Sequence, residues 1–95
     1  MEDFEKLLQT ETKMVLVDFY AQWCGPCKKL TPFLEKLDDT KIHLVKIDVD
    51  ENSDIADKYK ITSLPTILFF KNGILCETFI GANENKLSEI ISKLI

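Results

Sequence analysis

The segment Trp23-Cys24-Gly25-Pro26-Cys27 follows an apolar run and is the part of this chain most suited to chemistry. Two cysteines separated by two residues can close a disulfide when the first turn of a helix holds them together. Gly25 leaves no side chain to obstruct an incoming partner. Pro26 suits a helix start, because the amide donor that it lacks would have no intrahelical partner there. The pattern predicts reversible thiol–disulfide exchange, with the sulfur of Cys24 facing solvent.

The elements that position this pair follow from the hydrophobic pattern. β-branched and aromatic runs predict strands, and apolar residues at helical spacing predict helices. Asn72-Gly73 predicts a two-residue hairpin turn, Asn83 can cap the last helix, and Pro32 should kink the helix that contains it. We expect helices over residues 3–10, 24–37, 54–60 and from 83 onward, and strands over residues 14–21, 42–49, 64–70 and 75–80.

The order of these elements predicts the architecture. A strand–helix–strand unit requires parallel strands, whereas the later hairpin adds an antiparallel pair. Ninety-five residues leave no room for a second core. We therefore predict one α/β domain over residues 1–95, with a mixed central sheet and helices on both faces.

The composition argues against several classes of function. The net charge is −4, and all 12 cationic residues are Lys, so no arginine is available for bidentate binding of phosphate. With no basic cluster and only 3 glycines, neither nucleic acid nor a nucleotide is an expected partner. No apolar run is long enough to cross a bilayer, and the acidic start does not resemble a signal peptide. We expect a cytoplasmic protein.

Beyond the cysteine pair, the chain resembles thioredoxin over almost its whole length. The resemblance is carried by Val17-Asp18-Phe19-Tyr20-Ala21, Trp23-Cys24-Gly25-Pro26-Cys27-Lys28, Pro32, Lys46, Asp48-Val49-Asp50, Leu64-Pro65-Thr66, Phe70-Lys71-Asn72-Gly73 and Gly81-Ala82. It implies the thioredoxin fold and a general protein disulfide reductase, with Cys24 as nucleophile and Cys27 as resolving thiol. It also implies no bound cofactor, electrons from NADPH through a flavoprotein thioredoxin reductase, and clients such as peroxiredoxins, ribonucleotide reductase or methionine sulfoxide reductases.

One departure from the family concerns the first strand. Thioredoxins usually begin with a strand before the first helix, and only Met1-Glu2-Asp3 precedes Phe4 here. We therefore expect four strands, with residues 42–49 at an open sheet edge. Such an edge is either shielded by the charges of Lys41, Lys46 and Asp48 or used in self-association. We expect a monomer.

Asp18 interrupts a strand that should be buried on both faces, so desolvation should raise its pKa. Such a group can take a proton from Cys27 during the resolving step and return it later. The resemblance assigns this role to Asp18, with Lys46 on the neighbouring strand as its basic partner. The alternative is a structural Asp–Lys pair with no part in turnover.

The resemblance also implies a docking surface for clients. It makes the Leu64-Pro65 bond cis and places it against the disulfide, whereas an ordinary proline at a strand start would be trans. Tyr20 is expected to support the active-site loop, with its hydroxyl seeking a polar partner. The expected substrate-binding residues are Trp23, Gly25, Pro26, Leu64, Pro65, Gly81 and Ala82.

The third thiol, Cys76, should lie opposite Phe69 by hairpin register and be buried as a small hydrophobe. The alternatives are regulatory oxidation or intermolecular pairing. A zinc site of Cys24, Cys27, Cys76 and His43 would have enough ligands. However, His43 and Cys76 fall far apart along the predicted sheet, so we expect no metal.

Two competing functions share much of this pattern. A disulfide isomerase or oxidase would use the same fold, but those enzymes favour a more polar pair between the cysteines than Gly25-Pro26. A non-enzymatic binding module would be expected to have lost one cysteine, and both are present.

Overall fold

The computed structural model describes all residues from Met1 to Ile95, and each element expected from the sequence is present. Element ends differ from the predicted ones by no more than two residues, and Pro32 lies inside a helix that ends at Glu35. The elements are α1 (Glu2–Thr10), β1 (Met14–Tyr20), α2 (Gly25–Glu35), β2 (Ile42–Asp48), α3 (Ser53–Lys58), β3 (Thr66–Lys71), β4 (Ile74–Ile80) and α4 (Glu84–Leu94).

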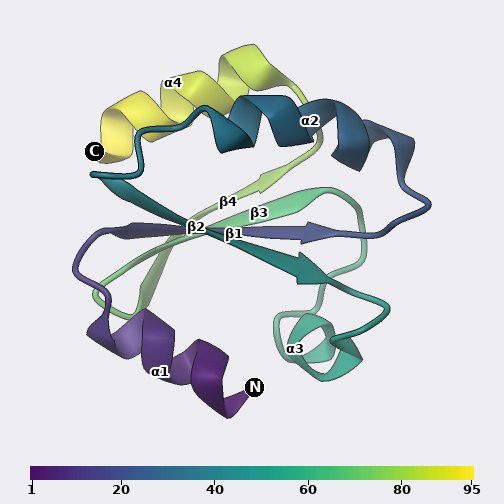
Figure 1. The fold of residues 1–95 in the computed structure, drawn as a ribbon, viewed down its shortest axis with the longest axis horizontal. Coiled ribbons are helices and arrows are strands. Elements are labelled where there is room, and N and C mark those ends of the chain that lie inside the picture. Colours follow the sequence, from purple (N-terminus) through teal and green to yellow (C-terminus); the bar gives the residue numbers. More distant parts are fainter.

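The four strands form one mixed sheet in the order β2-β1-β3-β4. β1 pairs parallel with β2 through the crossover helix α2, and β3 pairs antiparallel with both β1 and β4. Figure 1 shows α2 and α4 on one face of the sheet and α1 and α3 on the other. The predicted four strands, with helices on both faces, are confirmed. None of the four helices combines the length and the apolar character needed to cross a membrane.

The central strand β1 divides the core in two. Val15, Val17 and Phe19 point into the cluster under α1 and α3, whereas Met14 and Leu16 point into the cluster under α2 and α4. Successive side chains of a strand alternate between faces, so both faces of β1 are buried. The strand that leads into the cysteine pair is therefore held from both sides.

The position of Cys76 differs from the prediction. The turn at Asn72 and Gly73 pairs Lys71 with Ile74, which by simple counting would place Cys76 opposite Phe69. Instead the register shifts, and Phe69 pairs with Glu77, so Cys76 becomes the extra residue of a β-bulge. Its side chain is exposed, and the expectation of a buried, inert thiol is wrong.

One edge of the sheet is β4, and the other is β2, as expected, because β2 pairs only with β1. Lys41 and Lys46 are exposed there, but Asp48 is buried and cannot shield the edge. The Nδ1 atom of His43 lies 2.5 Å from a carboxylate oxygen of Glu11, which ties the loop after α1 to the start of β2. Cationic side chains therefore dominate the exposed part of this edge.

We expect these charges to keep the chain monomeric at high concentration. Pairing two β2 edges would bring like charges together, which destabilises a sheet. Sedimentation velocity over a wide concentration range measures this. The double variant Lys41→Val, Lys46→Val removes both charges and should self-associate more readily than the wild type. A wild-type dimer that grows with concentration would contradict the expectation.

Candidate active site

Cys24 occupies the N-cap of α2, directly after the turn that leaves β1. Its backbone is extended, and the Cys27 amide donates a hydrogen bond to its sulfur, with N and Sγ 3.2 Å apart. The sulfur thus takes the place that a Ser or Asp oxygen has in an ordinary helix cap. Pro26 lies in the first turn, where no amide donor is required. Amide groups and the positive end of the helix dipole therefore face the sulfur, which favours its anionic form.

Cys24 and Cys27 form a disulfide in this structure, with their Cα atoms 5.3 Å apart. Both residues are largely buried: Cys24 is 5% exposed and Cys27 is 2% exposed, and together with Ala21 they pack against Tyr20, Val49 and Leu64. This differs from the expectation of a sulfur that faces open solvent. Access to Cys24 is instead through a pocket.

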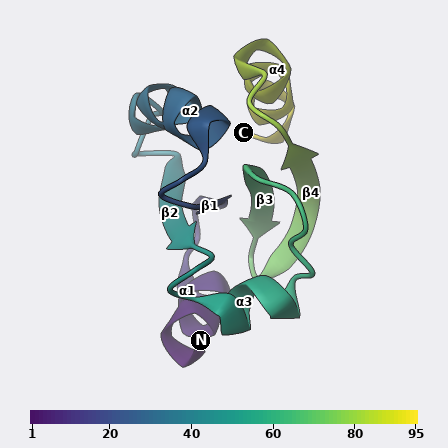
Figure 2. The same cartoon turned by 90° about the vertical axis from the view of Figure 1, so that its right-hand side faces the viewer.

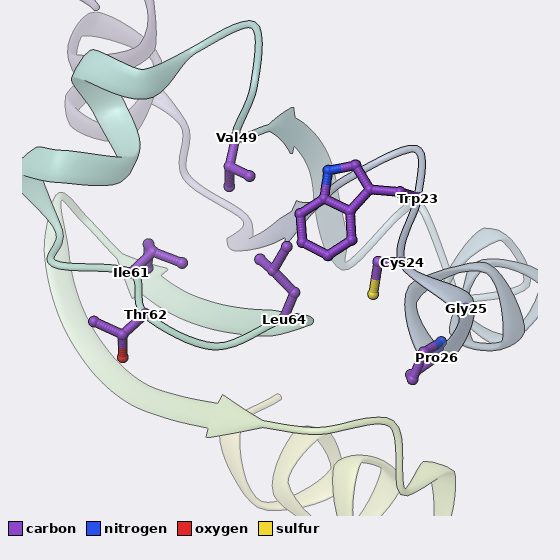
Figure 3. A pocket seen from close by; sticks show the side chains of 8 residues that line it. All are labelled: Trp23, Cys24, Gly25, Pro26, Val49, Ile61, Thr62 and Leu64. Atoms are coloured by element: carbon purple, nitrogen blue, oxygen red, sulfur yellow. The ribbon is translucent and has the colours of Figure 1, made fainter.

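That pocket has a volume of about 530 Å³ and is mostly apolar. Figure 3 shows the Cys24 sulfur pointing into the gap between Leu64 and Pro26, below the ring of Trp23. The residues that line the pocket are Trp23, Cys24, Gly25, Pro26, Val49, Ile61, Thr62 and Leu64. Four of the substrate-binding residues expected from the sequence line it (Trp23, Gly25, Pro26 and Leu64), whereas Val49, Ile61 and Thr62 were not predicted.

The Trp23 ring forms an exposed wall of the pocket, with 71% of its surface accessible. Its indole nitrogen donates a hydrogen bond of 2.9 Å to a carboxylate oxygen of Asp50. The Asp50 amide in turn donates to the buried Asp48 carboxylate, also at 2.9 Å. The end of β2 therefore fixes the orientation of a side chain in the loop after β1. Sequence reasoning missed this role of Asp50, although Asp48-Val49-Asp50 was part of the resemblance.

Pro65, Gly81 and Ala82 lie beside the pocket and do not line it. The Leu64-Pro65 bond is cis, as the resemblance implies, and Pro65 is fully buried. The Gly81 amide donates a hydrogen bond of 3.0 Å to the Pro65 carbonyl, and Gly81 has a φ of 114°, a value that favours glycine. Gly81 and Ala82 are half-buried. Gly81 thus holds the segment that contains Leu64 and Pro65 through this hydrogen bond.

Asp18 is 1% exposed, and neither of its carboxylate oxygens has a hydrogen-bond partner. Burial raises the pKa of this carboxyl to about 6, and the positive charge of Lys46 opposes that rise. Asp18 and Lys46 are register partners on β1 and β2, so their side chains point to the same face of the sheet. The expectation of a buried acid with a raised pKa is confirmed.

Lys46 forms no ion pair with Asp18. Its ammonium nitrogen lies over the Tyr20 ring, 4.9 Å from the ring centroid, at the distance of a cation–π contact. Burial raises the pKa of the Tyr20 hydroxyl, and the negative charges of Asp48 and Glu51 raise it further. Lys46 therefore acts on Asp18 through its charge and without a direct ion pair.

A second hollow of about 170 Å³ opens on the other side of the disulfide. Cys27, Tyr20, Lys28 and Lys46 are among the residues that line it. Since Leu16 faces α2, Asp18 two positions later lies on the same face of β1 and is turned toward the helix that carries Cys27. The disulfide is thus bordered by two hollows, one lined by Cys24 and the other by Cys27.

The four residues considered for zinc do not converge. His43 is on the edge strand β2, where it contacts Glu11, and Cys76 is exposed on β4 at the opposite edge of the sheet. The cysteine pair lies at the N-terminus of α2.

The geometry of the site agrees with three comparisons. The thioredoxin family pattern matches residues 1–93. The chain belongs to the thioredoxin family. Thioredoxin 1 of Plasmodium falciparum is 42% identical over 93 residues, which cover 96% of this chain and 88% of that protein. A solved structure of Plasmodium falciparum thioredoxin superposes with a TM-score of 0.93 at 40% identity, covering 100% of this chain and 94% of the other.

A further relative, chloroplastic thioredoxin Y of Oryza sativa, is 52% identical over 83 residues, which cover 83% of this chain and 49% of that protein. The thioredoxin fold and general protein disulfide reductase activity expected from the sequence are therefore confirmed. The chain is a thiol–disulfide oxidoreductase.

The buried Asp18 gives a prediction about stability. Its folded pKa of about 6 exceeds its ordinary value of 3.8, so the folded state binds a proton that the unfolded state has lost between these values. The free energy of unfolding should therefore fall by about 2.5 kcal/mol as pH rises from 4 to 8 because of this group. The variant Asp18→Asn should stabilise the protein more at pH 8 than at pH 4, by about that difference.

Denaturant unfolding of the oxidised protein at both pH values measures this effect. The exposed Asp57 provides the matched control, because Asp57→Asn makes the same change of side chain at a position that is not buried. An equal effect of Asp18→Asn at both pH values would mean that Asp18 titrates at its ordinary pKa.

Proposed function

We propose that the chain donates electrons to disulfides of other proteins in two successive exchanges, with Cys24 attacking and Cys27 resolving. The observation that carries this proposal is the position of the two sulfurs. Cys24 caps α2 and lines the apolar pocket, whereas Cys27 lies behind it against the second hollow. A client can reach the first sulfur through the pocket without displacing the second.

In the first exchange, the Cys24 thiolate attacks one sulfur of a client disulfide. A Cys24–client disulfide forms, the client S–S bond breaks, and the second client sulfur leaves as a thiolate that takes up a proton. The helix N-terminus holds the negative charge of the attacking sulfur before reaction, and thioredoxins are a standard case of the resulting lowering of the thiol pKa. The pocket walls Trp23, Val49 and Leu64 supply apolar contact for the client chain.

In the second exchange, Cys27 loses its proton and attacks the sulfur of Cys24. The Cys24–Cys27 disulfide forms, the remaining client thiolate is released, and the client has gained two electrons and two protons. Asp18 is the proton acceptor for Cys27 in this proposal. A carboxylate whose pKa lies near 6 is ionised at neutral pH yet basic enough to take a proton from a nearby thiol.

The disulfide must then be reduced again for a further cycle. Electrons from NADPH through a flavoprotein thioredoxin reductase, clients of the peroxiredoxin, ribonucleotide reductase or methionine sulfoxide reductase type, and a cytoplasmic location are parts of this proposal. The family membership supports a reductase and disulfide clients in general. The family includes a chloroplastic relative, so location has to be measured in the cell.

The variant Cys27→Ser should accumulate mixed disulfides with client proteins. Cys24 can still attack, but no second thiol is available to release the client. Non-reducing electrophoresis followed by mass analysis detects the adducts. The matched variant Cys24→Ser should trap none. Equal trapping by both variants would contradict the proposal, because it would show that Cys24 is not the specific attacking thiol.

The variant Asp18→Asn should slow the second exchange by about a hundredfold at pH 7, the lower end of the range for positioned proton acceptors. The first exchange should change little, because Asp18 faces the side of Cys27. Rapid-quench measurement of the mixed disulfide separates the two steps. In the wild type the second step should slow as pH falls below about 6, where Asp18 is protonated. Equal rates for variant and wild type would remove Asp18 from the reaction.

A further inference from the structure

The strand β4 leaves apolar side chains uncovered next to the active site. Leu75 is 46% exposed and Ile80 is 60% exposed. Their register partners Phe70 and Thr66, on β3, place them on the face of the sheet that carries α1 and α3. Figure 2 shows β4 as the outer strand, with the segment that follows α3 running alongside it and no helix over this part of the strand.

A groove of about 120 Å³ lies between that segment and β4. Leu75, Thr78 and Ile80 form one wall, and Lys60, Ile61 and Thr62 contribute to the other. An apolar cavity of about 150 Å³ in a protein holds a benzene molecule, so this groove has room for one side chain. Lys60 is the only charged residue that lines it.

The groove adjoins the pocket around Cys24, because Ile61 and Thr62 line both. A client whose disulfide meets the Cys24 sulfur must enter that pocket. The chain on one side of the attacked cysteine is therefore brought to Ile61 and Thr62, at the entrance of the groove. A short extended stretch, at about 3.3–3.6 Å per residue, can continue into it.

The wall formed by residues 60–62 is held in place by the end of α3. Lys60 has a φ of 54°, and the Ile61 amide donates a hydrogen bond of 3.0 Å to the Ala56 carbonyl. This is the arrangement of a left-handed helix terminus, in which the residue after the helix reverses the chain direction. The position of Lys60 and Ile61 is thus set by backbone hydrogen bonds, and the groove exists before a client arrives.

We propose that this groove is a second client subsite, which binds an apolar side chain of leucine size near the attacked cysteine, with a carboxylate of the client beside Lys60. The proposal rests on the proposed function, since it concerns clients of the same sulfur. The exposed apolar walls and the single cation define the chemistry of the occupant. The groove thereby favours some client sequences over others without touching the reacting atoms.

The test uses synthetic peptides with one internal disulfide. In one series a leucine is moved stepwise away from one cysteine, and in the matched series serine takes its place. Rate constants for reduction by the reduced wild-type protein are measured by quenching and chromatography. At one spacing the leucine peptide should react at least severalfold faster than the serine peptide. A glutamate after that leucine should add to the advantage, and a lysine there should reduce it.

The variants Ile80→Glu and Leu75→Glu should abolish the leucine advantage. Ile74→Glu is the matched control, because Ile74 is 69% exposed on the same strand but does not line the groove. It should keep the full advantage. Lys60→Gln should remove the glutamate effect and keep the leucine effect. All four variants should reduce glutathione disulfide, which is too small to reach the groove, at the wild-type rate.

The proposal is overturned if leucine gives no advantage at any spacing, or if Ile80→Glu and Ile74→Glu lower it equally. A loss confined to groove variants and to leucine peptides supports it. Failure of the wild type to reduce both glutathione disulfide and every peptide would instead overturn the proposed function, and the subsite with it.

Discussion

The hydrogen bond from the Cys27 amide to the Cys24 sulfur is the contact on which the active site depends. It places the sulfur at the one point of α2 where backbone donors lack intrahelical partners. A sulfur one turn later would face satisfied amides and gain nothing from the helix dipole. The sequence achieves this placement with a buried strand that ends one short turn before the cysteine, and with Pro26 where a missing donor does no harm. Packing does not require a glycine at position 25, since a Cβ there would meet no atom within 4 Å, but a side chain would project into the space beside the pocket.

Asp18 shows that the site is not arranged for stability alone. A buried carboxyl without hydrogen-bond partners is unfavourable at neutral pH, and an apolar residue in the same strand would extend the core without interruption. The strand tolerates the acid because β1 is packed on both faces by the two apolar clusters. Lys46 moderates the cost through its charge but keeps its ammonium over Tyr20, so the carboxyl stays free to accept a proton. The same burial that costs stability raises the pKa of the carboxyl to about 6, as the proposed proton transfer from Cys27 requires.

The helices and strands could be located from the sequence because the hydrophobic periodicity is clear and the turn and cap residues are distinctive. Met14–Tyr20 is continuously apolar apart from Asp18, and Asn72-Gly73 and Asn83 mark a turn and a cap that the structure contains. The sequence did not predict features that depend on tertiary structure alone. The β-bulge that exposes Cys76 has no signal at the level of turn residues. The burial of Asp48, and the Trp23–Asp50 hydrogen bond that it supports, require knowing that β2 ends against the loop after β1.

The walls Val49, Ile61 and Thr62 were missed for a related reason, and they explain how the site joins its surroundings. Each follows an element rather than belonging to one: Val49 comes directly after β2, and Ile61 and Thr62 come soon after α3. Such residues have no periodicity of their own, so their direction depends on how the element before them ends. α3 is only 6 residues long and ends in a left-handed turn at Lys60, which leaves the following segment beside β4 instead of over it. The short helix therefore couples the shape of the sulfur pocket to an open apolar strand face, and any client chain that leaves the pocket past Ile61 and Thr62 meets that face.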